Sequence, residues 1–263
     1  MLHFDAHIGW LFTELPFEER FAAAAEAGFK AVEHPNLYDY SAHRIADYLK
    51  DNGLAFVQTS TPTGDSKKGD RGLACRPERR EEFRDGVGAA IEYAEIIECK
   101  ILHVMAGLKA PDADLNAYND TYVDNVRFAG RTCAEKGIKV IIEPTSDYYV
   151  PGFYLNTPNM AARALEDIDD ENVFLLFDCY HAQCSQGNLV DFIRKHVKKI
   201  AHIQIADAPE RNEPGSGEIN YNYVLKTLDD LHYNGWIGCE YRPSENTEQS
   251  LRWLDPKTGK FEV

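Results

Sequence analysis

Four short apolar runs in the second half of the chain each end in a side chain that carries an oxygen ligand. The runs read KVIIE, VFLLFD, AHIQ and IGCE, and they end at Glu143, Asp178, Gln204 and Glu240. Carboxylate and amide oxygens are the hard donors that Mg²⁺ and Mn²⁺ prefer. Three carboxylates gathered at one place repel one another, and a divalent cation among them relieves that repulsion. The pattern therefore predicts a site for one divalent metal ion.

Further polar residues stand near these run ends. His181 follows Asp178 by three residues, and His7 and His103 lie close to the ends of two other apolar runs. Arg211 lies in the segment DAPERNEPGSG, and a guanidinium suits the two oxygens of a substrate carboxylate. Each of the four also fits a structural role, as a packed histidine or a charged loop rim. We take them as candidate substrate contacts.

The elements that would position these residues alternate along the chain. Strand-like runs are typically followed by stretches with helical periodicity, and there are eight such pairs. The strands are expected at 3–8, 31–34, 54–59, 101–105, 139–143, 173–178, 199–205 and 236–240. The helices are expected at 16–27, 41–52, 81–97, 115–135, from 157, 189–196, 221–232 and 247–253. This order predicts an α/β fold, a (β/α)₈ TIM barrel whose active site lies at the C-terminal strand ends.

The chain carries no sign of a domain boundary. No Pro- or Gly-rich linker divides it, so we expect residues 1–263 to form one barrel domain with a polar tail from about residue 255. No Gly-x-Gly-x-x-Gly turn follows the first run, which argues against a dinucleotide-binding fold. The polar segment 61–77 is long for a loop inside a domain, and such loops are usually functional.

Charge, apolar run lengths and cysteine spacing indicate which kinds of partner and compartment fit the chain. The net charge is −15, a balance that disfavours binding to nucleic acid. The N-terminus lacks the pattern of a signal peptide, and no apolar run is long enough to cross a membrane. The six cysteines form no C-x-x-C pair, which favours free thiols in a reducing compartment. These features predict a cytoplasmic protein that acts on a small molecule.

Longer motifs point to a known family. They are FDAHIGWLFTELPFEERFAAAAEAGF, GDRGLACRPERREEFRDGV, HIQIAD, EPGSGEINY and GWIGCEYRP. In these motifs, and over nearly its whole length, the chain resembles the hydroxypyruvate isomerase family, within the xylose-isomerase-like TIM barrels. The resemblance implies that the four residues at the run ends hold one Mg²⁺ or Mn²⁺ ion. It also implies that Glu143 and Glu240 are the proton-transfer pair and that His181 and Arg211 contact the substrate.

The implied reaction interconverts hydroxypyruvate and 2-hydroxy-3-oxopropanoate (tartronate semialdehyde) by proton transfer through a metal-stabilised enediolate. Two segments, HVMAG and HAQCSQGNLV, look closer to the related 2-oxo-tetronate isomerases, and Arg242 stands where a lysine is common. Related ketose 3-epimerases have a histidine at the position of Gln204. The alternatives are therefore a 2-oxo-tetronate isomerase or a ketose 3-epimerase, and more distantly a metal-dependent endonuclease or a non-catalytic binding barrel. Barrels of this group often associate, so a homo-oligomer is compatible with the resemblance.

Overall fold

The computed structural model describes residues 1–263 and contains one large sheet of nine parallel strands. Their order in the sheet is β3-β2-β1-β9-β8-β7-β6-β5-β4. The strands are β1 (His3–His7), β2 (Ala31–Glu33), β3 (Ala55–Phe56), β4 (Thr59–Ser60), β5 (Ile101–His103), β6 (Lys139–Ile142), β7 (Val173–Asp178), β8 (Ile200–Ile205) and β9 (Trp236–Cys239). All eight pairings within this sheet are parallel, as expected when helices connect successive strands.

The two edges of this sheet are consecutive in the chain. Strand β3 pairs with β2 and β4 pairs with β5, and only Val57 and Gln58 separate β3 from β4. The strand predicted at 54–59 is therefore interrupted by two residues. Because this one stretch contacts both neighbours, the sheet curls into a barrel, and the predicted TIM-barrel class is confirmed.

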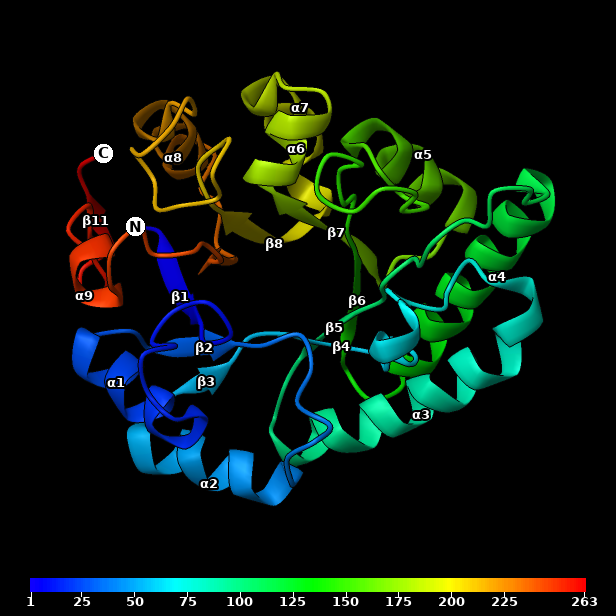
Figure 1. The fold of residues 1–263 in the computed structure, drawn as a ribbon, viewed down its shortest axis with the longest axis horizontal. Helices are drawn as coiled ribbons and strands as arrows, with labels where there is room; N and C mark the ends of the chain where they lie inside the picture. Colours follow the sequence, from blue (N-terminus) through cyan, green and yellow to red (C-terminus); the bar gives the residue numbers. More distant parts are fainter.

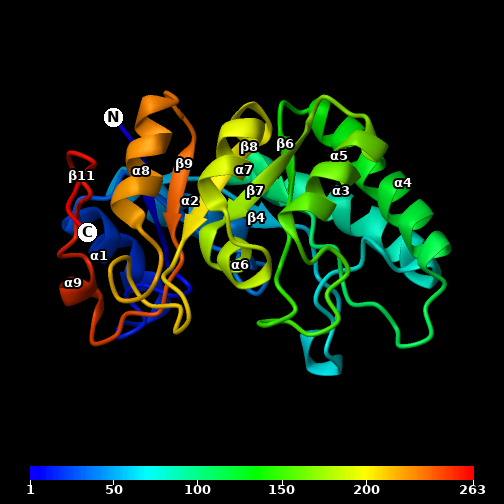
Figure 2. The same cartoon turned by 90° about the horizontal axis from the view of Figure 1, so that it is seen from above.

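Helices follow one another around the outside of the strands, as Figures 1 and 2 show. They are α1 (Arg20–Ala27), α2 (Ala42–Asn52), α3 (Arg80–Ile96), α4 (Leu115–Ala134), α5 (Pro158–Ile168), α6 (Cys179–Ser185), α7 (Leu189–His196), α8 (Tyr221–Asp230) and α9 (Thr247–Ser250). Short 3₁₀ turns occupy Phe17–Glu19, Ser66–Lys68, Pro77–Arg79 and Val197–Lys199. Helix α6 is absent from the sequence-based expectation, because seven residues are too few for a clear helical period.

The core lies between the strands and the ring of helices. A single hydrophobic cluster of 66 buried residues joins them, and it includes Val140, Leu175 and Ile203 from the strands. The six cysteines are free, as predicted, and five are buried. The tail from residue 255 is largely at the surface but contributes a small antiparallel pair, β10 (Leu254–Asp255) with β11 (Lys260–Phe261). No helix is long and apolar enough to cross a membrane.

Candidate metal and active site

A cavity of about 230 Å³ opens where the strands end, at the C-terminal mouth of the barrel. Seven of the eight residues predicted for the site line it: His7, His103, Glu143, His181, Gln204, Arg211 and Glu240. The eighth, Asp178, is buried directly beside them, with its Oδ2 3.2 Å from Nη2 of Arg211. The structure thus brings together residues that lie far apart in the sequence.

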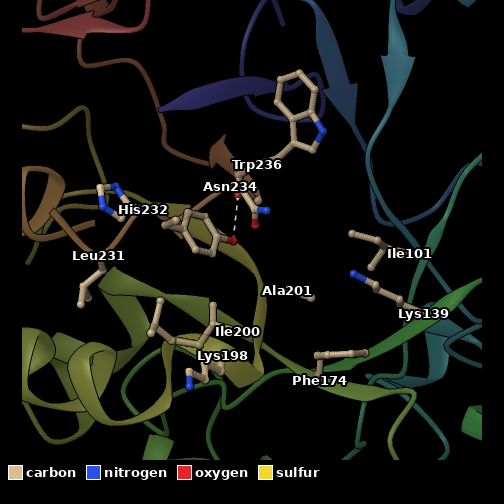
Figure 3. A pocket seen from close by; sticks show the side chains of 13 residues that line it. Ile101, Lys139, Phe174, Lys198, Ile200, Ala201, Leu231, His232, Asn234 and Trp236 are labelled. Atoms are coloured by element: carbon tan, nitrogen blue, oxygen red, sulfur yellow. Dashed lines mark hydrogen bonds between the residues drawn. The ribbon is translucent and has the colours of Figure 1, made fainter. Parts of the chain in front are cut away.

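A second cavity, of about 480 Å³, lies at the opposite end of the strands (Figure 3). Its walls include Lys139 and Trp236, which are the first residues of β6 and β9. No carboxylate lines this cavity, whereas two lysines do. It therefore lacks the donors that a divalent metal needs, and the N-terminal face of a TIM barrel is ordinarily the stabilising one.

Asp178 is held in place by the helix that follows it. Its Oδ1 accepts the backbone N–H groups of Tyr180 and His181, at 2.7 and 3.4 Å, and so caps the N-terminus of α6. Its other oxygen, Oδ2, faces Arg211 and lies 3.5 Å from Nε2 of His181. One oxygen of this carboxylate thus fixes its orientation, and the other is presented to the site.

Each of the two glutamates has a histidine beside it. Glu143 follows β6, and its Oε2 lies 3.6 Å from Nε2 of His103. Glu240 follows β9, and its Oε1 lies 3.4 Å from Nε2 of His7. Burial lowers the pKa of both histidines to about 4, so both rings are neutral at neutral pH. A neutral imidazole offers one donor and one acceptor to a ligand in the cavity.

The three carboxylates disturb one another's protonation. Burial, followed by the charges of Glu240 and Asp178, raises the pKa of Glu143 well above its usual range. Burial also raises the pKa of Asp178 to about 7, against the opposing charge of Arg211. The pKa of Glu240 is raised by burial as well. A divalent cation bound among these groups would favour their ionised forms and so reverse these shifts.

Arg211 is the cation that these carboxylates face in the chain itself. Its Nη2 donates to Oε2 of Glu240 at 2.9 Å, and its Nη1 lies 3.3 Å from Nε2 of His181. The guanidinium also lies against aromatic rings, 4.4 Å from the centroid of Tyr149 and 5.1 Å from that of Trp10. Its backbone has a φ of 61°, a left-handed conformation that is uncommon outside glycine and is often found at functional sites.

The loop that carries Arg211 is organised by one aspartate. Oδ1 of Asp207 accepts the backbone N–H groups of Ala208 and Ile219, both at 2.9 Å. Its Oδ2 accepts the N–H of Gly215 at 2.9 Å. These bonds close the loop after β8 onto its own start. The loop between Asp207 and Ile219 is therefore folded back on itself, and Arg211 within it is buried instead of exposed at the edge of the barrel mouth.

Sequence reasoning missed a buried acid beneath Gln204. Glu33 is the last residue of β2, and its Oε1 accepts a hydrogen bond from Nε2 of Gln204 at 2.9 Å. Its Oε2 lies 2.8 Å from Nε2 of His202 and 2.9 Å from Nε2 of Gln58. Burial would raise the pKa of Glu33, but the charge of His202 and its hydrogen bond outweigh burial and lower that pKa to about 2. A signal existed, because Glu33 also ends an apolar run, AVE.

Arg71 was also missed. It lies in the segment 61–77, which was expected to be functional, and it lines the cavity at the strand ends. Its Nη1 donates to the backbone carbonyl of Asp70 at 2.9 Å, and it forms no ion pair with the protein. No pattern in the sequence marks which of the charged residues in this loop reaches the cavity.

The donor set suits Mg²⁺ or Mn²⁺. Glu143, Asp178 and Glu240 supply carboxylate oxygens, and ligand atoms of Glu143, Asp178 and His181 lie within 4.8 Å of one another. The amide nitrogen of Gln204 donates to Glu33, so its amide oxygen points away from Glu33, on a side chain that lines the cavity. Hard oxygen donors of this kind, gathered and mutually repelling, fit a divalent metal.

The fold and the site define a TIM barrel with an acidic cluster of oxygen donors at its C-terminal mouth. A model of the xylose isomerase-like TIM barrel family matches residues 21–257. The chain belongs to this family. It is 40% identical over 256 residues to the hydroxypyruvate isomerase of Escherichia coli (strain K12), covering 97% of this chain and 99% of the relative. It is likewise 40% identical over 260 residues to the 2-oxo-tetronate isomerase of Cupriavidus necator, covering 99% and 100%.

Solved structures agree with this fold. A Brucella melitensis protein described as an AP endonuclease of family 2 superposes with a TM-score of 0.95 at 39% identity, covering 97% of this chain and 99% of the other. The D-psicose 3-epimerase of Clostridium cellulolyticum H10 superposes with a TM-score of 0.77 at 17% identity, covering 98% and 92%, and shares the fold alone. With curated isomerases at 40% identity over nearly the full chain, this protein is a hydroxypyruvate-isomerase-like enzyme of the isomerase class.

Proposed function

We propose that the protein is a metal-dependent isomerase that interconverts hydroxypyruvate and 2-hydroxy-3-oxopropanoate, with Glu143 and Glu240 as the proton-transfer pair. The observation that carries this proposal is the convergence of Glu143 and Glu240 on one cavity, with Asp178 buried beside them and the amide oxygen of Gln204 left for the same cavity. The 40% identity to hydroxypyruvate isomerase supports the choice of reaction. We infer a small 2-oxo or hydroxy acid as substrate.

The reaction moves a carbonyl group between neighbouring carbons. One glutamate removes a proton from C3 of hydroxypyruvate, the other delivers a proton to C2, and the hydroxyl proton passes from O3 to O2. No atom is gained or lost. A divalent ion held by the four ligand residues would supply Lewis-acid chemistry to the two substrate oxygens. Glu143 and Glu240 are suited to proton transfer because both carboxylates line the cavity and each has a neutral histidine beside it.

The neighbouring histidines assist this pair. His103 and His7 are neutral and each lies within 3.6 Å of its glutamate, so each can donate a hydrogen bond to a substrate oxygen without adding charge. His181 is directed by Ser146, whose Oγ lies 3.3 Å from its Nδ1. Its Nε2 faces the guanidinium of Arg211, and burial, then that guanidinium, lowers the pKa of His181 well below its usual value. We infer that it orients the substrate as a neutral ring.

An acid substrate also explains Arg71. Arg211 is already occupied by Asp178 and Glu240, whereas Arg71 lines the cavity without an ion-pair partner. A free guanidinium is the group that binds a carboxylate with two parallel hydrogen bonds. We infer that Arg71 binds the substrate carboxylate, which favours 2-oxo acids over uncharged ketoses. The equal identity to 2-oxo-tetronate isomerase makes the four-carbon acid the second candidate substrate.

The decisive experiment is an activity panel with hydroxypyruvate, 2-oxo-tetronate and free ketoses, run after chelation and after addition of Mg²⁺ or Mn²⁺. We expect activity on a 2-oxo acid that a chelator abolishes and either metal restores. Full activity after removal of metal would overturn the metal proposal, and turnover of ketoses alone would make the protein a 3-epimerase. Incorporation of deuterium from D₂O into substrate carbon separates catalysis from mere binding.

The similar Brucella melitensis protein is described as an AP endonuclease, so a nuclease function is the alternative to test. An endonuclease for abasic DNA of this type uses a cluster of zinc ions and a basic face for the phosphate backbone. This chain has a net charge of −15 and offers Gln204 in its donor set. We expect one divalent ion per chain and no cleavage of abasic DNA. Two or three zinc ions per chain, with cleavage, would support the nuclease instead.

A further inference from the structure

The buried carboxylate of Glu33 lies at the junction of several polar side chains beneath the proposed metal site. It is fully buried, and it meets Gln204 through Oε1 and both Gln58 and His202 through Oε2. Strand β2, which carries Glu33, is separated in the sheet from β8, which carries His202 and Gln204, by β1 and β9. Glu33 therefore reaches across the barrel interior from β2 to β8.

Glu33 can reach Gln204 because a neighbouring residue, Gly238, has no side chain. Gly238 of β9 lies between β1 and β8, and a Cβ atom placed there would come within 2.9 Å of Cδ of Glu33 and collide with its Oε1. It would also come within 3.1 Å of Nε2 of His202. Glycine at this position thus leaves the space that the Glu33 carboxylate fills. The contact between Glu33 and Gln204 depends on that space.

The contact decides which end of the Gln204 amide faces the cavity. A carboxylate accepts hydrogen bonds and an amide donates only through its nitrogen, so the nitrogen of Gln204 must point at Glu33. The amide oxygen is then directed the other way, towards the cavity that Gln204 lines. If the amide turned over, its NH₂ group would face the metal, and the lone pair of that nitrogen is delocalised into the carbonyl group and does not bind a cation. Partners that orient a ligand in this way commonly alter metal affinity about 10- to 100-fold.

We propose that Glu33 is a positioning residue that fixes the Gln204 amide with its oxygen towards the metal. This inference rests on the proposed metal site. It predicts that Glu33→Gln, in which the NH₂ group of the new amide can satisfy a turned-over Gln204, weakens Mn²⁺ binding about 10- to 100-fold. The measurement is the Kd of the protein for Mn²⁺ alone, by isothermal titration calorimetry, without substrate. Thermal unfolding of the metal-free variant checks that it is folded.

A paired exchange separates positioning from general damage. Adding Gln204→Glu to Glu33→Gln restores an acceptor facing a donor, now with the carboxylate on the metal side, so the double variant should regain Mn²⁺ affinity relative to Glu33→Gln. Gln204→Glu alone sets two carboxylates against each other and should destabilise the fold. Asp5→Asn is the matched control, because Asp5 belongs to the same buried cluster but makes no hydrogen bond to Gln204. Its Kd for Mn²⁺ should stay within about threefold of the wild type, well below the change expected for a ligand partner.

The outcomes are distinct. If the wild type does not bind Mn²⁺, the proposed function fails. If the wild type binds Mn²⁺ and Glu33→Gln binds it equally well, the positioning role is overturned and the proposed function stands. The role is also overturned if the folded double variant binds as poorly as Glu33→Gln, or if Asp5→Asn weakens binding as much as Glu33→Gln does.

Discussion

Nη2 of Arg211 donates to Oε2 of Glu240 at 2.9 Å, so a proposed metal ligand is already paired with a positive charge of the chain. The same nitrogen lies 3.2 Å from Oδ2 of Asp178. The guanidinium would thus compete with a bound metal ion for these two carboxylates, and its Nη1 also lies 3.3 Å from Nε2 of His181. We therefore expect Arg211 to affect both metal binding and catalysis, and two measurements on one variant should separate these effects.

For Arg211→Leu we expect Mn²⁺ to bind at least about tenfold more tightly, because a competing charge in direct contact with two ligand carboxylates is gone. We expect kcat/KM to fall at the same time, because His181, which we propose orients the substrate, loses the guanidinium that lies 3.3 Å from its Nε2. Titration calorimetry and steady-state kinetics on the same preparation measure both. Weaker Mn²⁺ binding in a folded variant would show that Arg211 supports the metal site instead of competing with it.

The proton-transfer pair is tested by isosteric amides. Glu143→Gln and Glu240→Gln should each lower turnover by at least about 100-fold, the usual scale for loss of a general acid or base. Each keeps the size of the side chain and an oxygen donor. Glu218→Gln is the matched control, since that exposed glutamate pairs only with Gln183, 3.0 Å away on the surface, and turnover should be unchanged. Near-normal turnover in either of the first two would end the assignment of that residue.

Arg71→Met tests the recognition of the substrate carboxylate. Loss of a charged hydrogen-bond donor should lower kcat/KM for hydroxypyruvate about 10- to 100-fold. Competitive inhibition by dihydroxyacetone, which lacks the carboxylate, should be unchanged. Arg76→Met is the control within the same segment, because Arg76 is paired with Glu78 and does not line the cavity. Equal losses for the acid and the uncharged compound would contradict the proposal for Arg71.

The buried carboxyl group of Asp5 should make the free energy of unfolding depend on pH. It is fully buried, and burial, followed by the charge of Glu33, raises the pKa of its carboxyl well above 3.8. Folding therefore takes up a proton at pH values above about 4, where the unfolded Asp5 is ionised. The stability that this raised pKa contributes is complete below that pH and is lost as the pH rises towards the folded pKa.

Asp5→Asn has no proton to take up. Its stability relative to the wild type should therefore grow as the pH rises above about 4, and level off once the pH passes the folded pKa of Asp5, by at most about 1.4 kcal/mol per pH unit. Urea unfolding of both metal-free proteins across this range measures the difference. A difference that stays constant or shrinks with rising pH would show that Asp5 is ionised in the folded protein.

The sequence predicted the part of the site that depends on local pattern. Glu143, Asp178 and Glu240 could be found because each ends an apolar run, and a parallel barrel brings such ends together. Glu33 ends an apolar run too, but its contact with Gln204 depends on barrel closure and on the space at Gly238, which no local pattern encodes.

Loop conformation was the other limit of sequence reasoning. The segment 61–77 was expected to be functional, but only the folded chain shows that Arg71 is its residue at the cavity. The strand expected at 54–59 has a break at Val57 and Gln58, where the chain passes from pairing with β2 to pairing with β5. Apolar content predicts such a strand but not where its hydrogen-bond partner changes.

A side chain at Gly238 should disturb both the fold and the metal site. A methyl group there must displace the carboxylate of Glu33, so Gly238→Ala should destabilise the protein by about 1–3 kcal/mol, the usual cost of overpacking a core. It should also weaken Mn²⁺ binding, because Glu33 can no longer hold Gln204.

Gly88→Ala is the matched control: Gly88 lies within α3, and a Cβ there meets no heavy atom within 4 Å. That substitution should stabilise the protein by up to about 1 kcal/mol and leave Mn²⁺ binding unchanged. Urea unfolding and Mn²⁺ titration of both variants measure these effects, and unaltered metal affinity in Gly238→Ala would mean that Glu33 can move without disturbing the ligand.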